Sequence, residues 1–346
     1  MKLLVITQAV DTEDPVLGFF TRWIDELAKR VERVEVVCLR EGSHTLPANV
    51  RVHSLGKESG MPPAARNRFT YTIRFVRLVW RLRHEYDAVF VHMNPEYVLL
   101  GGVFWQLRGT RVAFWYNHPS DNLRLRLALL LTDRVFYTSP YAATAHSPKA
   151  LRMPVGIDTE LFSPRYAPRN RHALYMQGRI MPSKRVERAL AALRLLRDRV
   201  PATLTLVGPE DVRYGKELRK RFKDLVDAGA VTFAGPRKNA ETPALFSAHG
   251  AVVNLAAAGH FDKAVFEAMA CETPVVTSSS AFAGIVPDEW VVAEDDAPAL
   301  AGALARLLAL SEPKYRALGT ALRAEVVRGH NLTSLADRLV VEVEAL

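Results

Sequence analysis

The segment GHFDKAVFEAMACETPVV, residues 259–276, decides the fold of this chain. It starts as a polar loop, continues as a short helix and ends in an apolar strand. Gly259 lets the backbone approach a ligand, and Asp262 is placed to cap the helix. The helix N-terminus offers N–H groups to an anion, while Glu267 can accept hydrogen bonds from the hydroxyls of a ribose. The pattern is typical of a site for a sugar nucleotide.

A second segment, YMQGRIMPSKR at residues 175–185, predicts a strand and a loop before a helix from Val186 to Val200. Gly178 stands where the strand ends, so the backbone can come close to a ligand. Arg179 and Lys184 place two cations beside the following helix N-terminus, as a diphosphate leaving group requires. Such charges usually belong to a loop exposed to solvent. Their position about eighty residues before Glu267 makes the pair a more specific indication of a ligand site.

With these two segments the chain resembles the retaining glycosyltransferases of family 4, which have the GT-B fold. The family pattern is Gly-Arg, a spacer and Lys, then two glutamates separated by seven residues and followed by Ala-Met-Ala. Glu267 matches the second glutamate, and Gly259 stands in place of the first. The resemblance implies that Gly259 and Phe261 belong to the donor site, and that His260, Asp262 or Lys263 replaces the missing carboxylate.

The segment PVGIDTELFSP, residues 154–164, resembles the interdomain segment of the same family, with Val155 in place of the usual Asn. The expected domains are residues 1–154, an acceptor-side Rossmann-like domain, and residues 155–346, a nucleotide-sugar-binding Rossmann-like domain. We expect the last helix, Ser334 to Ala345, to pack back on the first domain.

The segments LTLVG at 204–208 and VTFAG at 231–235 predict strands on either side of a charged helix from about Gly215 to Ala228. The resemblance implies that Phe233 to Lys238 line the base of the nucleotide, with Phe233 and Arg237 as donor-site residues. For Phe233 an ordinary place in the core is the stronger alternative.

The front half predicts a βαβ unit, and further strands follow it. A parallel sheet with helices on both faces is the natural architecture. The expected fold class is therefore α/β, a GT-B protein whose two Rossmann-like domains have parallel sheets that face an interdomain cleft. The expected strands are Met1–Thr7, Val34–Leu39, Ala88–His92, Val112–Tyr116 and Arg134–Tyr137, with a helix at Gly18–Ala28 after the first.

Parallel sheets bind ligands beyond the carboxyl ends of their strands. The loop after the first strand holds Asp11 and Asp14 and runs into Gly18, so these residues are predicted on the acceptor side. His118 follows another strand, and the resemblance implies that it orients the donor sugar. His92 also ends a strand, and the sequence leaves open whether it binds the acceptor or is a structural histidine.

Composition is consistent with two globular domains: 346 residues, 49% hydrophobic, without an apolar run of the ~20 residues that span a membrane. Met1 leads straight into a strand, so we expect no signal peptide. Cys38 and Cys271 have no metal-ligand spacing, which indicates a cytoplasmic protein without a metal or a disulfide framework. Asp295 and Asp296 precede a helix, and capping is the better interpretation than metal binding.

The net charge of +9 favours an acidic partner. The basic, aromatic-rich stretch at 64–84 has the composition of a membrane-surface helix, which would place the protein at the inner face of the membrane. The alternative is that its apolar face packs on the sheet and its arginines are solvated. No recognised nucleic-acid-binding motif accompanies the charge, so nucleic acid is not an expected partner.

The predicted reaction transfers a sugar from a nucleotide diphosphate sugar, UDP- or GDP-linked, to a hydroxyl of a glycan, a lipid-linked or a small-molecule acceptor. The resemblance implies retention of configuration with no cofactor and no metal, with His118, Arg179 and Lys184 as catalytic residues. A nucleotide-sugar-binding protein without transferase activity stays open because of Gly259 and Val155. A GT-B sugar-nucleotide epimerase also stays open, although acid and base residues for it are not evident in the sequence.

Overall fold

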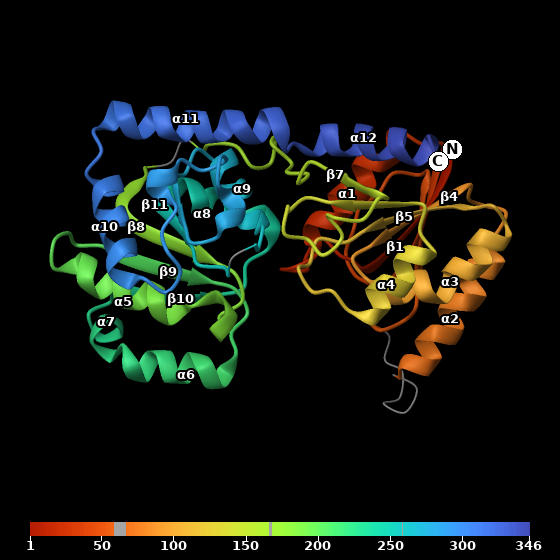
Figure 1. The fold of residues 1–346 in the computed structure, drawn as a ribbon. Helices are drawn as coiled ribbons and strands as arrows, with labels where there is room; N and C mark the ends of the chain where they lie inside the picture. The colour runs from red at the N-terminus through yellow and green to blue at the C-terminus, as the bar shows by residue number, and fades with distance from the viewer. Residues whose placement is uncertain (59–66, 166–167, 258) are drawn as a thin grey trace. The chain divides into compact units, whose positions relative to one another are not determined.

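The computed structural model describes residues 1–58, 67–165, 168–257 and 259–346 (Figure 1). The chain divides into two compact units. Unit 1 comprises Met1–Gly156 and Leu332–Leu346, and unit 2 comprises Ile157–Asn331. The chain therefore returns to unit 1 for its last helix.

Unit 1 contains, in its described residues, a parallel sheet of seven strands in the order β3-β2-β1-β4-β5-β6-β7. The direction of strand succession reverses between β1 and β4, as in doubly wound folds. The strands are β1 (Lys2–Val10), β2 (Arg33–Glu41), β3 (Val50–Ser54), β4 (Ala88–His92), β5 (Arg111–Trp115), β6 (Arg134–Tyr137) and β7 (Ala150–Arg152).

Helices cover both faces of this sheet because alternate strand residues point to opposite sides. Leu3 and Val5 of β1 pack toward α1 (Gly18–Ala28) and α12 (Leu332–Glu344). Leu4 and Ile6 pack toward the other three helices, which lie on the opposite side in Figure 1. These are α2 (Arg68–Arg81), α3 (Pro95–Leu107) and α4 (Leu123–Leu130).

Unit 2 contains a parallel sheet of five strands among its described residues, in the order β10-β9-β8-β11-β12. Here the reversal lies between β8 and β11. The strands are β8 (Asn170–Gln177), β9 (Thr203–Val207), β10 (Val231–Gly235), β11 (His249–Asn254) and β12 (Val275–Thr277).

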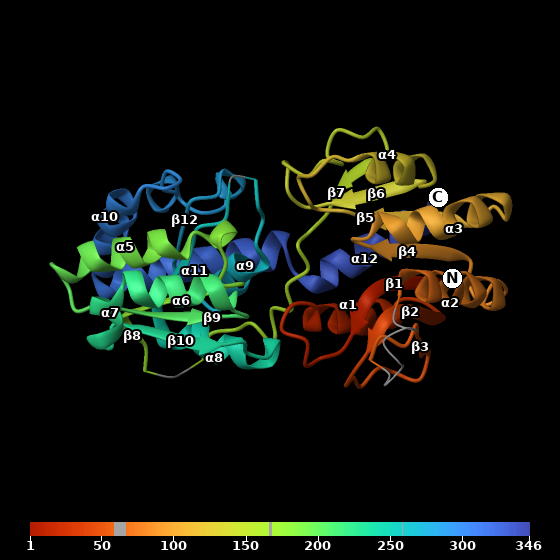
Figure 2. The same ribbon diagram turned by 90° about the horizontal axis from the view of Figure 1, so that it is seen from below.

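The helices of unit 2 also pack on the two faces of its sheet, and α5 lies beside α10 while α9 contacts α8 and α11 (Figures 1 and 2). Short 3-10 turns at Pro182–Lys184, Asn239–Glu241, Ser280–Phe282 and Asp288–Trp290 connect them. The helices are α5 (Val186–Arg197), α6 (Val212–Arg221), α7 (Lys223–Asp227), α8 (Thr242–Ala248), α9 (Lys263–Ala270), α10 (Ala297–Leu308) and α11 (Glu312–Gly329).

Several predicted elements differ from the structure in ways that have a physical cause. The charged helix predicted from Gly215 to Ala228 is two helices, α6 and α7, because Phe222 between them leaves the helical conformation and buries its ring. Asp296 caps α10 by accepting a hydrogen bond from the Ala299 N–H at 2.7 Å, as predicted. The strands β3, β7 and β11 were not predicted; β3 and β7 are short and lack fully buried residues, whereas β11 has six residues, five of them buried, and shortness does not account for it.

Candidate functional site

The candidate donor site lies where the strand order of unit 2 reverses, at the carboxyl ends of β8 and β11. Gly178 and Arg179 directly follow β8, and the loop after β11 leads into α9. Ligands of open parallel sheets bind at such a reversal, because the loops on its two sides diverge toward opposite faces. The topology thus brings residues 175–185 and 259–276 to the ends of neighbouring strands.

Backbone packing between two glycines fixes the first loop. Gly178 and Gly208 both have φ of 146°, a conformation that side chains disfavour. A Cβ on Gly208 would lie only 1.9 Å from the carbonyl oxygen of Gly178. The loops that follow β8 and β9 therefore touch backbone to backbone, and the position of Arg179 depends on this contact.

Lys184, at the end of the Pro182–Lys184 turn, makes an ion pair with Asp262, the residue just before α9. Lys184 Nζ lies 2.6 Å from Asp262 Oδ2, which also accepts a hydrogen bond of 2.9 Å from Asn254 Nδ2. The expectation that the Asp262 side chain caps α9 is wrong, since its carboxylate turns to Lys184 and the backbone alone occupies the cap position. The two predicted residues, 78 positions apart, are thus held together. Arg179 is exposed on the same loop.

Lys263 is the first residue of α9, and Glu267 lies one turn further along the helix. Glu267 is only 4% exposed, and Asn239 Nδ2 donates to its Oε1 at 3.4 Å. Burial lowers the pKa of Lys263 to about 7, and the charge of Glu267 opposes this shift. A carboxylate and a readily titrated amine therefore stand together where anions are stabilised by the helix N-terminus. Asn239 was not predicted as a site residue, and its position just after Arg237-Lys238 was the only signal in the sequence.

The loop before α9 is anchored at several points. Gly259 has φ of 83°. The carbonyl oxygen of His260 accepts a hydrogen bond from Ser279 Oγ at 2.7 Å, while the Phe261 ring stacks on Phe282 with ring centroids 5.0 Å apart. Phe261 is thus part of the core that supports the loop, and Gly259 and His260 lie at its turn.

The predicted base-binding residues of β10 and its following loop lie in different environments. The guanidinium of Arg219 stands over the Phe233 ring, 3.8 Å from its centroid, and is itself paired with Glu210 at 2.5 Å. One face of Phe233 is therefore covered by a side chain that the sequence analysis did not consider. Arg237 is exposed, with a weak hydrogen bond of 3.3 Å to the carbonyl of Pro236.

His118 of unit 1 follows β5 and is exposed. Its Nδ1 accepts a hydrogen bond of 3.0 Å from the backbone N–H of Ser120. This contact assigns the proton of the neutral ring to Nε2, so that nitrogen is a donor. His118 has the tautomer that a group donating to a sugar hydroxyl requires.

His92, at the end of β4, is 4% exposed and stacks on Phe20 with ring centroids 4.0 Å apart. Phe19 and Trp23 of the same helix, α1, complete the aromatic surroundings. This burial favours the structural role of the two that the sequence left open.

The predicted acceptor-side carboxylates organise their own loop. Asp11 accepts the Glu13 N–H at 3.0 Å, and Asp14 accepts the Leu17 N–H at 2.8 Å. Both are paired with Arg40 of β2. A Cβ on Gly18 would lie 3.0 Å from the carbonyl oxygen of Thr12, so the start of α1 packs closely on the loop.

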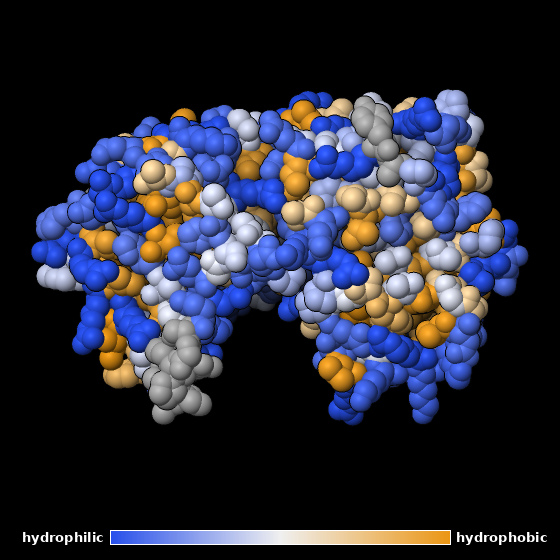
Figure 3. All heavy atoms as spheres, turned by 180° about the vertical axis from the view of Figure 1, so that it is seen from behind, coloured by the Kyte–Doolittle hydropathy of each residue, from blue (hydrophilic) through white to orange (hydrophobic). Residues whose placement is uncertain are grey.

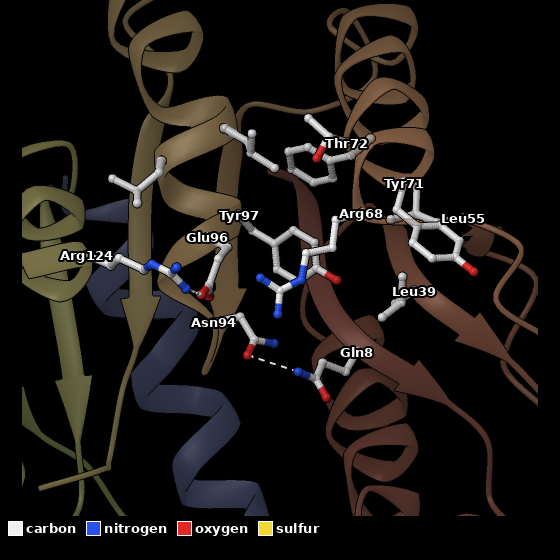
Figure 4. Close-up of a pocket in the computed structure, with 13 residues that line it drawn as sticks. Gln8, Leu39, Leu55, Arg68, Tyr71, Thr72, Asn94, Glu96, Tyr97 and Arg124 are labelled. Atoms are coloured by element: carbon white, nitrogen blue, oxygen red, sulfur yellow. Dashed lines mark hydrogen bonds and ion pairs between the residues drawn. The ribbon is translucent and has the colours of Figure 1, made fainter. Parts of the chain in front are cut away.

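A pocket of about 500 Å³ lies in unit 1 between α2 and α3 (Figure 4). Gln8 and Asn94, which stand on the two sides of the strand-order reversal, are joined there by a hydrogen bond of 3.0 Å. A second cavity of about 650 Å³ is lined by His118 and shares Asn94, Glu96 and Arg124 with the first. Met93, beside it, has a φ of 69°, a conformation that is rare for a residue with a side chain.

Two further features of the structure concern metal binding and membrane crossing. Within the described residues, no group of His, Cys, Asp and Glu side chains is arranged to hold a metal ion. None of the described helices combines the length and apolar character that crossing a bilayer requires.

Comparison with known proteins identifies the architecture. The HepE protein of Anabaena, solved in complex with UDP and glucose, has a TM-score of 0.79 at 19% identity, with 100% of each chain covered. Sucrose-phosphate synthase from Thermosynechococcus elongatus has a TM-score of 0.75 at 20% identity, covering 100% of this chain and 99% of its own. The fold is GT-B. This confirms the predicted fold class of two parallel-sheet α/β domains.

Other comparisons agree with the GT-B fold. WaaG, a glycosyltransferase involved in lipopolysaccharide biosynthesis, has a TM-score of 0.68 at 16% identity, with 99% of each chain covered. Residues 171–310, which lie in unit 2, match the family model described as Glycosyl transferases group 1. No curated protein sequence matches the chain. The family match and the GT-B fold together support a nucleotide-sugar glycosyltransferase.

Proposed function

We propose that this protein is a retaining glycosyltransferase that moves a sugar from a nucleotide diphosphate sugar to an acceptor hydroxyl. One observation carries the proposal: Lys184, Asp262 and Glu267 gather at the strand-order reversal of unit 2, beside the N-terminus of α9. A cation, a ribose-binding carboxylate and a helix N-terminus are the groups that a sugar nucleotide requires there. Unit 2 is then the donor-side domain and unit 1 the acceptor-side domain.

In this proposal the diphosphate lies beside Arg179 and Lys184, which neutralise its charge as it departs. Glu267 accepts hydrogen bonds from the ribose, and Asn239 holds its carboxylate in place. The base lies toward Phe233 and Arg237. HepE was solved with UDP, so UDP is the first nucleotide to test, followed by GDP.

The missing glutamate at Gly259 is compensated by its neighbours. Asp262 already lies next to Lys184, and His260 and Lys263 flank it. We propose that these side chains contact the hydroxyls of the donor sugar. No metal and no cofactor is needed, because the two cations and the helix N-terminus carry the charge of the diphosphate.

Retention follows a front-face route. The bond from the anomeric carbon to the phosphate oxygen breaks, and the acceptor oxygen bonds to the same face of the sugar. The leaving phosphate takes the proton of the acceptor hydroxyl. His118, which carries its proton on Nε2, orients the donor sugar.

We also propose that unit 1 contacts an anionic membrane surface, which would place the protein at the cytoplasmic face of that membrane. Of the basic stretch 64–84, residues 64–66 lie outside the described part of the chain. Exposed apolar side chains recur at helical spacing on α2, α3 and α4, which cover one face of the sheet of unit 1. At the lower left of Figure 3, hydrophobic residues reach the surface among hydrophilic ones. The exposed apolar side chains are Phe69, Val76 and Trp80 on α2, Leu100, Val103 and Leu107 on α3, and Leu123, Leu127 and Leu130 on α4.

Arginines surround these stripes, and Arg83 stands over the Trp80 ring at 4.9 Å. Apolar side chains with nearby cations suit an interface with anionic lipid. Flotation with anionic vesicles at low salt should carry the protein upward, and the variant Phe69→Ser/Trp80→Ser should stay at the bottom. Val341→Ser, which removes an exposed apolar residue of α12, is the matched control. No flotation of the wild-type protein at low salt would end the membrane proposal.

The glycosyl-transfer proposal is tested by incubating the protein with UDP-sugars and GDP-sugars without added metal, and following nucleotide release. Slow release without an acceptor, and faster release with one, is the expected result. Tight nucleotide binding without release from any donor would favour the binding protein instead.

A further inference from the structure

The pocket between α2 and α3 of unit 1 has an apolar wall. The wall comes from the carboxyl-terminal part of β2, from both helices and from the segment after β3 (Figure 4). Tyr97 is half-buried, and burial raises the pKa of its hydroxyl to about 12. The wall is made by Leu39, Leu55, Tyr71, Phe75, Tyr97 and Leu99.

One end of the same pocket is polar. Arg68, the first residue of α2, is exposed, and in Figure 4 its guanidinium points toward the end where Asn94 and Glu96 lie. Arg124 reaches this end from α4 and pairs with Glu96 at 3.0 Å. Both partners of that pair are more than half exposed, at 62% and 51%, so the pair is weak and Arg124 can exchange it for another anion.

The polar end leads to the region of His118. Asn94, Glu96 and Arg124 line both the pocket and the cavity that contains His118. The apolar end leads instead to the surface, because Leu100 lines the pocket and is 38% exposed. It is followed on the exposed side of α3 by Val103 and Leu107.

We infer that this pocket binds an anionic amphiphile, a molecule with an aliphatic chain and a phosphate or similar anionic group. The aliphatic chain of the ligand lies against the apolar wall and leaves the pocket past Leu100, while the anionic group lies between Arg68 and Arg124. The pocket volume of about 500 Å³ is within the usual range for ligand sites. The inference rests on the proposed function in one respect: the amphiphile is taken to be the acceptor, so the acceptor class is lipid-linked.

The probe is decyl phosphate below its micelle concentration, with binding to the full chain measured by calorimetry. Arg68→Gln should weaken binding about tenfold by removing a charge-assisted contact. Thr72→Phe, which fills the pocket from α2, should weaken it by at least as much. Arg81→Gln, an exposed arginine of the same helix that does not line the pocket, should bind like the wild-type protein.

Two other probes separate the contributions of the chain and the charge. Inorganic phosphate and a neutral decyl glycoside should each bind at least about tenfold more weakly than decyl phosphate. Equal binding of inorganic phosphate, equal binding in Arg68→Gln and Thr72→Phe, or no binding of decyl phosphate would each overturn the inference.

UDP affinity separates this inference from the proposed function. Arg68→Gln and Thr72→Phe should bind UDP as the wild-type protein does, because UDP is assigned to unit 2. Absence of both UDP and GDP binding in the wild-type protein, with decyl phosphate still bound, would reject the proposed function and leave the pocket as an amphiphile site. Binding of either nucleotide without decyl phosphate binding would reject the pocket alone.

Discussion

Lys184 Nζ lies 2.6 Å from Asp262 Oδ2, so the cation assigned to the diphosphate is already paired with a carboxylate from the opposite side of the strand-order reversal. The pair joins the loop after β8 to the start of α9. A diphosphate must therefore compete with Asp262 for Lys184.

This competition predicts opposite effects of two substitutions. Lys184→Met should weaken UDP binding about tenfold or more, because a charge-assisted contact worth roughly 1.5–3 kcal/mol is lost. Asp262→Asn should strengthen it a few-fold, since the competing charge disappears while the amide can still accept from Lys184. Calorimetric titration with UDP measures both. Equal weakening in both variants would show instead that Asp262 positions Lys184 for the ligand.

Glu267→Gln should weaken UDP binding about tenfold, because an amide accepts ribose hydrogen bonds less strongly than a carboxylate. Deoxyuridine diphosphate should lose less affinity in the variant than UDP does, since it offers one hydroxyl fewer. Glu217→Gln, on the exposed side of α6, is the control and should change neither titration. The assignment of Glu267 to the ribose is rejected if the variant discriminates between the two nucleotides as the wild type does.

The sequence placed Gly178, Lys184 and Glu267 near strand and helix boundaries, and the parallel sheet brings these boundaries together at the strand-order reversal of unit 2. Their roles in donor binding stay predictions. The Lys184–Asp262 pair could not be predicted, since a residue before a helix can cap it or turn away from it with equal ease.

Other contacts depend on side chains far apart in the chain. Arg219 stands over Phe233 from α6, and the pocket of unit 1 combines Gln8, Arg68 and Arg124 from three separate elements. No local pattern relates these positions. The exposed stripes of α3 and α4 were missed for another reason. Helix α3 is apolar on nearly all sides, and in the first turn of α4 leucines alternate with arginines, so neither sequence shows a contrast between helix faces.

Lys263 predicts a pH dependence of stability. Its pKa in the folded protein is about 7, below the ordinary 10.5, so between these pH values the unfolded chain binds more protons than the folded one. Stability should therefore rise with pH across this range, and the cost of burying the charged amine should be greatest below about pH 7. In urea unfolding, Lys263→Met should be the more stable protein near pH 6, by an amount on the order of 2 kcal/mol, and the advantage should shrink toward pH 10.

Lys220→Met, on the exposed surface of α6, should show no such change with pH. A constant difference between Lys263→Met and the wild-type protein at all pH values would mean that Lys263 is charged throughout.

Gly208→Ala should lower the free energy of unfolding by at least about 2 kcal/mol, because the new Cβ would collide with the Gly178 carbonyl and the backbone conformation disfavours a side chain. UDP binding should weaken as well, since the loop that carries Arg179 is displaced. Gly302→Ala is the matched control: it lies inside α10 with space around it, and alanine there should stabilise the protein by about 0.5–1 kcal/mol. Chemical unfolding of the wild-type protein and the two variants measures these free energies. A Gly208→Ala variant as stable as the wild type would contradict the backbone contact.

The most direct test of the central claim is calorimetric titration of the wild-type protein, Lys184→Met, Glu267→Gln and Glu217→Gln with UDP and GDP in the absence of metal. The account predicts saturable binding of one of these nucleotides to the wild-type protein and to Glu217→Gln, and about tenfold weaker binding to the other two variants. Binding that is equal in all four proteins, or no binding to any of them, would contradict a donor site at the strand-order reversal of unit 2.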